Sequence, residues 1–227
     1  MKEVAAIIVA GGKGTRMGST IKKQYLKIGE KEVLAHTVEA FEKVQAIKEI
    51  IVVTSEEDTD YVGELLCRQY GYKKVTQIVA GGKERQYSVF NGIKAIGENI
   101  DYVLIHDGAR PFIKEEVIIK SLEKAYEKKA CIVAVPVKDT IKQVDVNGKV
   151  ETTPNRASLW GIQTPQVFER SLIEKAHAYA KENSILGTDD SMLVEAIGEE
   201  VYIVEGDYTN IKITTPEDLI IAETFIK

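Results

Sequence analysis

The sequence predicts an α/β fold: a Rossmann-like, doubly wound and mostly parallel sheet from which a β-arm protrudes. Short apolar runs alternate along the chain with longer amphipathic stretches, which is the order of strands and crossover helices in such a sheet. The runs are apolar throughout, as strands covered by helices on both faces are. With 227 residues the chain has the length of one domain, which we expect to span residues 1–227.

The expected strands and helices follow from these two patterns. Continuous apolar runs predict strands at Ala6–Ala10, Ile50–Thr54, Tyr102–His106 and Cys131–Val137. Helical periodicity predicts helices at Val33–Val44, Asp58–Tyr70, Arg85–Ile96, Glu115–Lys128, Glu169–Glu182, Asp189–Ile197 and Pro216–Ile226. The final helix has the clearest start, because Thr215 suits an N-cap and Pro216 suits the first helical position.

One polar segment, residues 138–153, interrupts the alternation and predicts the β-arm. Valines flank Asn147-Gly148, the dipeptide that most strongly indicates a two-residue hairpin turn. Because the segment is too polar for a core, we expect it to project from the body as an arm of about residues 138–156. Arms of this kind often clasp a second subunit, and the alternative is a hairpin that stays in solvent.

Composition and charge restrict the class of function. The net charge of −5 argues against a protein that coats nucleic acid, so an anionic ligand must be held by a local group of cations. Cys67 and Cys131 lack C-x-x-C spacing and are typical of reduced thiols. Glu3 stands where a signal peptide is basic, and no apolar run reaches the length of a membrane-spanning helix. We therefore expect a cytoplasmic protein without nucleic-acid or membrane partners.

The loop after the first strand is the most informative stretch for function. It carries four glycines, which let its backbone N–H groups approach a ligand, together with the cations Arg16 and Lys23. Such a loop suits a polyphosphate. It is not a dinucleotide fingerprint, because Met17 occupies the third glycine position, and no Gly-Lys pair has the frame of a Walker A loop. An NAD-dependent oxidoreductase is therefore disfavoured.

Further polar clusters stand at the ends of other predicted strands, where parallel sheets bind their ligands. They are Gly81–Ser88, His106–Pro111, Arg156 with Gln163–Gln166, Thr188–Asp190 and Asn210–Thr214. Strand alternation places His106 and Asp107 on opposite faces, and Asp107 just beyond a strand end is a natural partner for Mg²⁺ or a hydroxyl group. Lys212 is expected in an alternating strand just before the final helix.

The predicted site is rich in cations and poor in bases. It combines Arg16, Lys23, Arg156 and Lys212 with one acid, Asp107, and the sequence shows no Ser-His-Asp or Cys-His set. Such a site suits phosphoryl or nucleotidyl transfer, in which catalysis rests on positioning and charge stabilisation. An attacking phosphate oxygen is already ionised near neutral pH, so no general base is required.

In order and combination, these motifs resemble the cytidylyltransferases of the nucleotide-diphospho-sugar transferase fold, and among them the 2-C-methyl-D-erythritol 4-phosphate cytidylyltransferase family of the non-mevalonate isoprenoid pathway. The motifs that carry the resemblance are Ala10–Gly18, Lys23–Leu26, Gly81–Val89, His106–Pro111, Gln163–Gln166, Thr188–Asp190 and Asn210–Lys212. The resemblance covers essentially the whole chain. It implies transfer of CMP from CTP to the polyol phosphate, with 4-diphosphocytidyl-2-C-methyl-D-erythritol and pyrophosphate as products.

The resemblance also implies a role for each site residue. CTP with Mg²⁺ lies over the glycine loop, and the nucleotide-binding residues are Ala10, Gly11, Gly12, Gly14, Thr15, Gly82, Lys83 and Ser88. The four catalytic cations form two pairs: Arg16 and Lys23 act on the α-phosphate, and Arg156 and Lys212 hold the polyol phosphate. The further second-substrate contacts are Asp107, Arg110, Thr140, Thr164 and Thr188. Asp107 is also the expected metal ligand.

The β-arm and two departures from the family pattern complete the implied site. Family members are homodimers whose arms exchange, so Thr140 and Arg156 would serve the neighbouring subunit. Lys22 replaces a usual proline, which removes a rigid φ angle, and Lys83 replaces a frequent acid. Two alternatives stay open: a ribitol 5-phosphate cytidylyltransferase with the same chemistry, and a non-catalytic nucleotide sensor. The sensor predicts that a catalytic cation is missing, whereas all are present.

Overall fold

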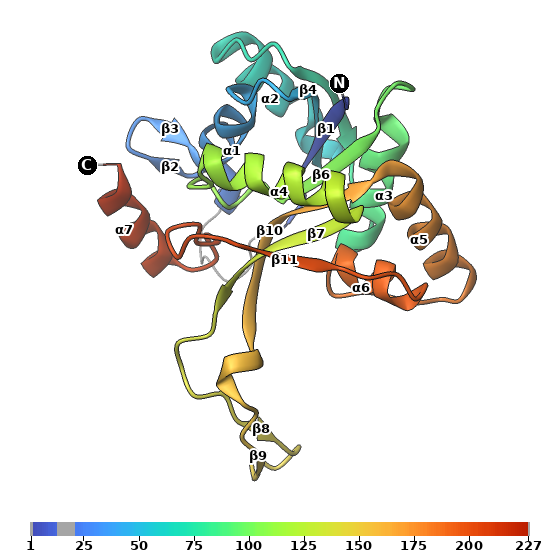
Figure 1. Cartoon of the computed structure of the whole chain (residues 1–227). Coiled ribbons are helices and arrows are strands. Elements are labelled where there is room, and N and C mark those ends of the chain that lie inside the picture. Colours follow the sequence, from blue (N-terminus) through green and yellow to red (C-terminus); the bar gives the residue numbers. More distant parts are fainter. Residues whose placement is uncertain (1, 13–20, 227) are drawn as a thin grey trace.

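The computed structural model describes residues 2–12 and 21–226. In this part of the chain, seven strands form one sheet in the order β11-β7-β10-β6-β1-β4-β5 (Figure 1). Their bounds are β1 Val4–Val9, β4 Ile47–Thr54, β5 Val75–Ala80, β6 Tyr102–Asp107, β7 Ala130–Pro136, β10 Trp160–Glu169 and β11 Tyr202–Glu205. Neighbouring strands are parallel except at β10, which runs antiparallel to β6 and β7. The predicted mostly parallel sheet is therefore confirmed.

Helices cover both faces of this sheet, as apolar strands require. One layer consists of α1 Val33–Glu42, α2 Thr59–Gly63 with its π-helical continuation Glu64–Gln69, and α4 Glu115–Lys128. The other consists of α3 Arg85–Ala95, α5 Arg170–Glu182 and α6 Asp190–Ala196. Alternation along β1 divides the core accordingly, because Ala6 and Ile8 face the first layer whereas Ala5 and Ile7 face the second. The predicted doubly wound architecture is therefore confirmed.

The helix boundaries largely agree with the sequence signals. The side chain of Asp189 accepts a hydrogen bond from the N–H of Met192 and so caps α6. The helix α7, Pro216–Phe225, begins with a capping box in which the Asp218 carboxylate accepts from the N–H of Thr215 at 2.8 Å. The single helix expected at residues 58–70 is divided into α2 and the π-helical turn. No helix within residues 2–12 and 21–226 is both long and apolar enough to span a membrane.

The sequence patterns do not predict β5, β10 and β11. β5 and β11 are the two edges of the sheet, and their exposed residues break the apolar run expected of a covered strand. β10 is largely buried yet contains polar residues, with a register shift between Ile162 and Gln166. The Gln166 amide donates to the Asp189 carboxylate at 2.9 Å. Tertiary hydrogen bonds of this kind satisfy the buried polar side chains of β10, so its sequence does not show the apolar run of a buried strand.

The strand expected around Lys212 is wrong. Residues 211–214 form no strand, and the N–H of Ile213 donates instead to the carbonyl of Ala109 at 2.8 Å. Ile213 is buried in a small apolar cluster with Val33 and Ala109. The alternation of apolar and polar residues therefore arises from packing on the loop after β6, not from pairing in a sheet. This packing places Lys212 beside the end of β6.

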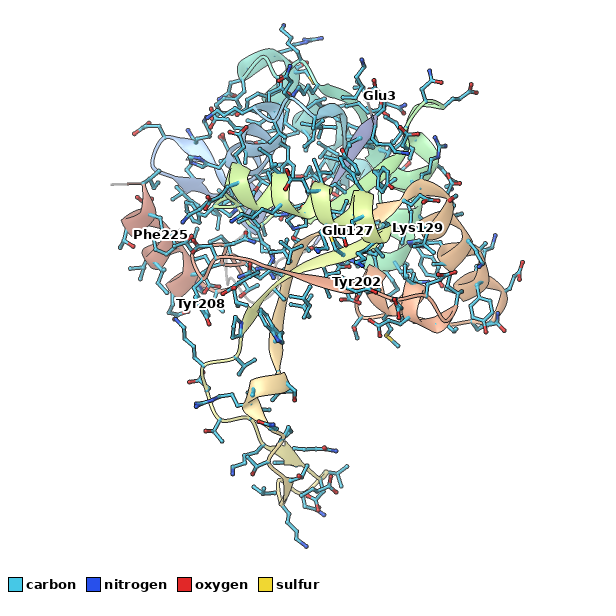
Figure 2. All side chains as sticks on the ribbon, in the orientation of Figure 1. Glu3, Glu127, Lys129, Tyr202, Tyr208 and Phe225 are labelled. Atoms are coloured by element: carbon cyan, nitrogen blue, oxygen red, sulfur yellow. The ribbon has the colours of Figure 1, made fainter. Side chains whose placement is uncertain are left out.

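The β-arm forms as the hairpin that the sequence predicts. β8 Gln143–Val144 and β9 Val150–Thr152 pair antiparallel, and Gly148 turns the chain with a φ of 81°. The arm projects from the body, and its side chains stand away from the core (Figures 1 and 2). At its base, the hydroxyl of Tyr208, labelled in Figure 2, donates to the carbonyl of Pro136 at 2.7 Å.

Candidate active site

A cavity of about 580 Å³ lies at the carboxyl ends of β1, β4 and β6, where open α/β sheets bind their ligands. Its lining residues are Val9, Ala10, Gly11, Gly12, Lys23, Gln24, Thr54, Ser55, Glu56, Gly81, Gly82, Lys83, Glu84, Arg85, Ser88, Asp107, Ala109 and Lys212. Six segments of the sequence, from residues 9–12 to Lys212, therefore meet in one place. Every predicted nucleotide-binding residue that the structure describes is among them; Gly14, Thr15 and Arg16 lie outside the described residues.

One wall of the cavity is made of backbone. The N–H of Gly81 donates to the carbonyl of Thr54 at 2.6 Å, which attaches the loop after β5 to the end of β4. The Ser88 hydroxyl accepts from the N–H of Gly82 at 3.0 Å and donates to the carbonyl of Glu84 at 3.1 Å. A Cβ atom at Gly82 would lie 2.3 Å from that of Tyr87. The turn therefore requires glycine at position 82, and the hydrogen bonds of Ser88 to Gly82 and Glu84 fix the backbone of this wall.

The facing wall is carried by the short 3₁₀ helix η2, Lys23–Tyr25. The Gln24 side chain is buried and donates to the carbonyl of Ala10 at 2.6 Å, so η2 is attached to the end of β1. Because Lys23 and Gln24 both line the cavity, this attachment brings a lysine to the same space as Gly11 and Gly12. η2 leads into the hairpin of β2 Lys27–Ile28 and β3 Lys31–Glu32.

Asp107, the last residue of β6, lies among three cations. Its Oδ2 is 2.8 Å from Lys212 Nζ and 3.6 Å from Arg110 Nε, and its Oδ1 is 3.5 Å from Arg85 Nε. Burial would raise the pKa of Asp107, but the attraction of Lys212 and Arg85 outweighs it and holds that pKa well below its usual range. The carboxylate is therefore ionised, and the surrounding cations outnumber it, as an anion-binding site requires.

Arg85 is a site residue that the sequence reasoning missed. It is the first residue of α3, and its Nη1 donates to Asp190 Oδ2 at 2.7 Å while its Nε faces Asp107. Burial would lower the pKa of Arg85, but the charges of Asp190 and Asp107 raise it. The available signal was an arginine opening a helix directly after the Gly81-Gly82 turn. Its partner Asp190 is 105 residues away, so the pairing itself is not visible in the sequence.

His106 and Asp107 point to opposite sides, as strand alternation predicts. The His106 ring packs 4.8 Å from Phe41, and its Nε2 lies 3.1 Å from the carbonyl of Arg110, so we assign the hydrogen to Nε2. Nδ1 then accepts from the Thr164 hydroxyl at 3.0 Å, and that oxygen in turn accepts from the N–H of Asp107 at 3.1 Å. Burial lowers the pKa of His106 to about 4. His106 thus orients the end of β6 and is not a base of the site.

Five of the predicted second-substrate or catalytic residues do not line the cavity within the part of the chain that the structure describes: Arg110, Thr140, Arg156, Thr164 and Thr188. Arg110 donates to the carbonyl of Asn210 at 2.8 Å, and Thr188 is exposed near the start of α6. Thr140 and Arg156 are exposed on the arm, where Arg156 donates to the carbonyl of Lys138 at 3.0 Å. The arm residues therefore stay outside the cavity of their own chain.

The cavity suits a metal only in company with a phosphate ligand. Within the described residues, no group of three or more His, Cys, Asp or Glu side chains could hold a metal ion. Glu56, Glu84 and Asp107 line the cavity, and Asp107 is the carboxylate paired with Lys212. Mg²⁺ is commonly held by one or two carboxylates together with substrate phosphates and water, and this donor set fits that arrangement.

The fold and the site define the class of protein. A sheet of this type, a glycine wall and several cations around an ionised carboxylate together are typical of a nucleotidyltransferase. A family model described as 2-C-methyl-D-erythritol 4-phosphate cytidylyltransferase matches residues 4–227. The chain is 53% identical over 224 residues to a protein of that name from Caldanaerobacter subterraneus subsp. tengcongensis, with 99% of each chain covered. It is 50% identical to one from Clostridioides difficile, covering 98% of this chain and 93% of that one.

Solved structures agree with these relatives. The crystal structure of 4-diphosphocytidyl-2C-methyl-D-erythritol synthase from Anaerococcus prevotii is similar with a TM-score of 0.87 and 37% identity, covering 99% of this chain and 96% of that chain. The corresponding cytidylyltransferase from Thermus thermophilus is similar with a TM-score of 0.78 and 31% identity, over 98% of each chain. The chain belongs to the 2-C-methyl-D-erythritol 4-phosphate cytidylyltransferase family.

Proposed function

We propose that the protein transfers CMP from CTP to 2-C-methyl-D-erythritol 4-phosphate, giving 4-diphosphocytidyl-2-C-methyl-D-erythritol and pyrophosphate. The observation that carries the proposal is the position of the Asp107 cluster. Asp107, Arg85 and Lys212 line the same cavity as Lys23 and the glycine wall, so one space offers cations to two phosphate-bearing substrates. The names of the relatives favour methylerythritol phosphate over ribitol phosphate as the acceptor.

The chemistry needs charge stabilisation and no general base. An oxygen of the polyol phosphate attacks the α-phosphorus of CTP, a new P–O bond forms, and the bond to the departing pyrophosphate breaks. Lys23, with Arg16, stabilises the negative charge that develops on the α-phosphate. The attacking oxygen is ionised near neutral pH, since the second pKa of a phosphate monoester is about 6. The buried His106, with a pKa of about 4, is not needed as a proton acceptor.

Lys212 is the group best placed to hold the polyol phosphate. Its side chain is 40% exposed and pairs with Asp107, so the ammonium can turn towards an entering phosphate while Arg85 and Arg110 continue to neutralise the carboxylate. Arg110 and Thr164 serve this half of the site by holding the loop after β6. Thr188 would complete it from the start of α6.

Mg²⁺ accompanies CTP, and Asp107 is the residue that would hold it. When bound, the ion neutralises part of the triphosphate charge. The protein's own contribution is a carboxylate kept ionised by its neighbours, so no proton has to leave before a cation binds. The backbone wall at Gly82 and Ser88, together with Lys83 at its rim, provides the surface for cytosine.

The protein acts as a homodimer in which the arm completes the neighbouring site. Support comes from the arm itself: Ile141, Val144, Val146 and Val150 are exposed there, and a free monomer leaves them in water. Arg156 and Thr140 do not line the candidate active-site cavity of their own chain, and we assign them to that cavity in the partner subunit.

A pyrophosphate-release assay with CTP and Mg²⁺ tests the proposal, with each polyol phosphate offered separately. We expect turnover with 2-C-methyl-D-erythritol 4-phosphate and little with ribitol 5-phosphate. Turnover with ribitol 5-phosphate alone would replace the proposed acceptor. CTP binding by calorimetry without turnover of either acceptor would instead favour the nucleotide sensor.

A further inference from the structure

Lys22, the residue before η2, attaches η2 to the loop after β4 through its side chain. Lys22 Nζ donates to Asp58 Oδ2 at 2.7 Å and to Ser55 Oγ at 2.9 Å, and it also contacts the carboxylate of Glu57. Ser55 follows β4, and the 3₁₀ helix η3, Glu56–Asp58, begins at the next residue. The lysine therefore bridges η2 to the loop at the end of β4.

Asp58 is the common partner of both sides of η2. Its Oδ2 accepts from the Tyr25 hydroxyl at 2.9 Å and from Ser55 Oγ at 2.7 Å, in addition to the ammonium of Lys22. Tyr25 Oη also lies 2.9 Å from Thr54 Oγ1. Burial, together with Asp58, raises the pKa of Tyr25 well above its usual range, so the hydroxyl keeps its proton and remains a donor. Lys22 and Tyr25 flank Lys23 and Gln24 in the sequence, and the side chains of Lys22 and Tyr25 both bind the Asp58 carboxylate.

The backbone of Lys22 has the shape that a proline would impose. Its φ is −61° and its ψ is 138°, whereas proline holds φ near −65° and favours such extended ψ values. The resemblance to the family implies a proline at this position, and its loss predicts a less rigid loop. In this chain the same dihedral angle occurs, together with a side chain that forms an ion pair.

We infer that Lys22 is a positioning residue, whose shared ion pair with Asp58 holds η2 against the end of β4 and thereby sets Lys23 and Gln24 in the cavity. The inference rests on the proposed function for its kinetic consequences only. The Lys22 and Asp58 side chains are 23% and 16% exposed, so the interaction is partly shielded from water yet still accessible to salt. A proline acts through covalent geometry, which salt does not screen.

Two substitutions separate the ion pair from the dihedral angle. Lys22→Ala removes the ion pair and adds no constraint on φ, so it should lower kcat roughly tenfold, with little change in the KM for CTP, because a small misplacement of Lys23 lowers transition-state stabilisation. Lys22→Pro restores the constraint on φ and should bring kcat back to within about twofold of the wild type. The matched control is Lys27→Ala, on β2, whose ammonium lies 3.9 Å from Glu32 and away from the cavity.

Salt and amide exchange give readouts that a loss of stability alone would not produce. Raising salt from about 50 to about 500 mM should lower the kcat of the wild type more than that of Lys22→Pro. Amide exchange over residues 23–26 should speed up in Lys22→Ala and stay slow in Lys22→Pro, at a Tm within about 2 °C of the wild type.

The outcomes distinguish this inference from the proposed function. Unchanged kcat and unchanged exchange in Lys22→Ala would overturn it, and so would a Lys22→Pro variant as slow as Lys22→Ala. If the wild type turned over no acceptor, the proposed function would fail, while amide exchange over residues 23–26 would still report whether Lys22 holds η2.

Discussion

The cavity and the β-arm place site residues in opposite surroundings. In the cavity, the side chain of Asp107 is 11% exposed and its two oxygens face three cations. On the arm, Val146 is fully exposed, and Arg156 donates to a carbonyl of the same arm. The cavity half of the site is therefore held by the folding of one chain. The exposed residues of the arm become buried only when the surface of another molecule covers them.

In the proposed homodimer, one site depends on two equilibria, the folding of each chain and the association of two chains. Residues of the cavity are ordered when the chain folds, so substitutions there should act at every protein concentration. Residues of the arm are ordered by association in the proposed homodimer, so substitutions there should have effects that depend on concentration.

The largest effect is expected in the cavity. Lys23→Ala should lower kcat by a factor on the order of 10²–10³, the size expected when one charge-stabilising donor is lost, with little change in CTP affinity. Steady-state kinetics at two protein concentrations would measure it, with Lys27→Ala as the exposed control. An unchanged kcat with a raised KM would assign Lys23 to ground-state binding instead.

Lowering the pH should lower the free energy of unfolding through protonation of His106, which is buried at the end of β6. Its folded pKa of about 4 lies below the ordinary value of 6.5, so as the pH falls the unfolded chain takes up the proton first. The stability that the neutral ring contributes is therefore complete above about pH 6.5 and is lost between 6.5 and 4, by an amount on the order of 3 kcal/mol. Urea unfolding across this range measures it, and His106→Gln should give a shallower slope. Identical slopes for the two proteins would contradict the assignment.

The next effect tests whether the arm acts on its neighbour. Lys23→Ala and Arg156→Ala subunits, each nearly inactive alone, should recover about a quarter of wild-type activity when mixed and exchanged in equal amounts, because half of the dimers are mixed and each contains one intact site. The recovery should grow with the time allowed for subunit exchange. Absence of any recovery would indicate sites that are complete within one chain.

The smallest effect is expected at the tip of the arm. Val146→Ser should change the free energy of unfolding by less than about 0.5 kcal/mol, since the side chain is already fully exposed. By contrast, Leu104→Ala in the buried strand β6 should cost about 2–5 kcal/mol. Chemical denaturation compares the two, and sedimentation would show whether Val146→Ser weakens the dimer. A Val146→Ser variant as destabilised as Leu104→Ala would show that the arm is part of the folded core.

Much of the fold could be predicted because buried strands and tight turns have patterns that can be recognised in short stretches of sequence. The apolar run of β6 and the hairpin turn at Asn147-Gly148 can each be recognised within a few residues. β10 could not, because its buried polar residues are satisfied by partners elsewhere, such as Asp189 for Gln166. The strand that the sequence predicts around Lys212 is wrong for a different reason, since packing on a loop can produce the same alternation as a sheet.

By itself, the sequence determined the α/β class, the segments that contribute to the site and the chemistry that those segments suit. Periodicity, glycine spacing and the kinds of charge are local properties, so they can be recognised without coordinates. Only the tertiary structure decided which groups meet: Arg85 with Asp190 and Asp107, and Lys22 with Asp58. It also showed that no residue of the arm lines the cavity of its own chain. These pairings follow from the order of strands in the sheet, which brings together residues that the chain keeps far apart.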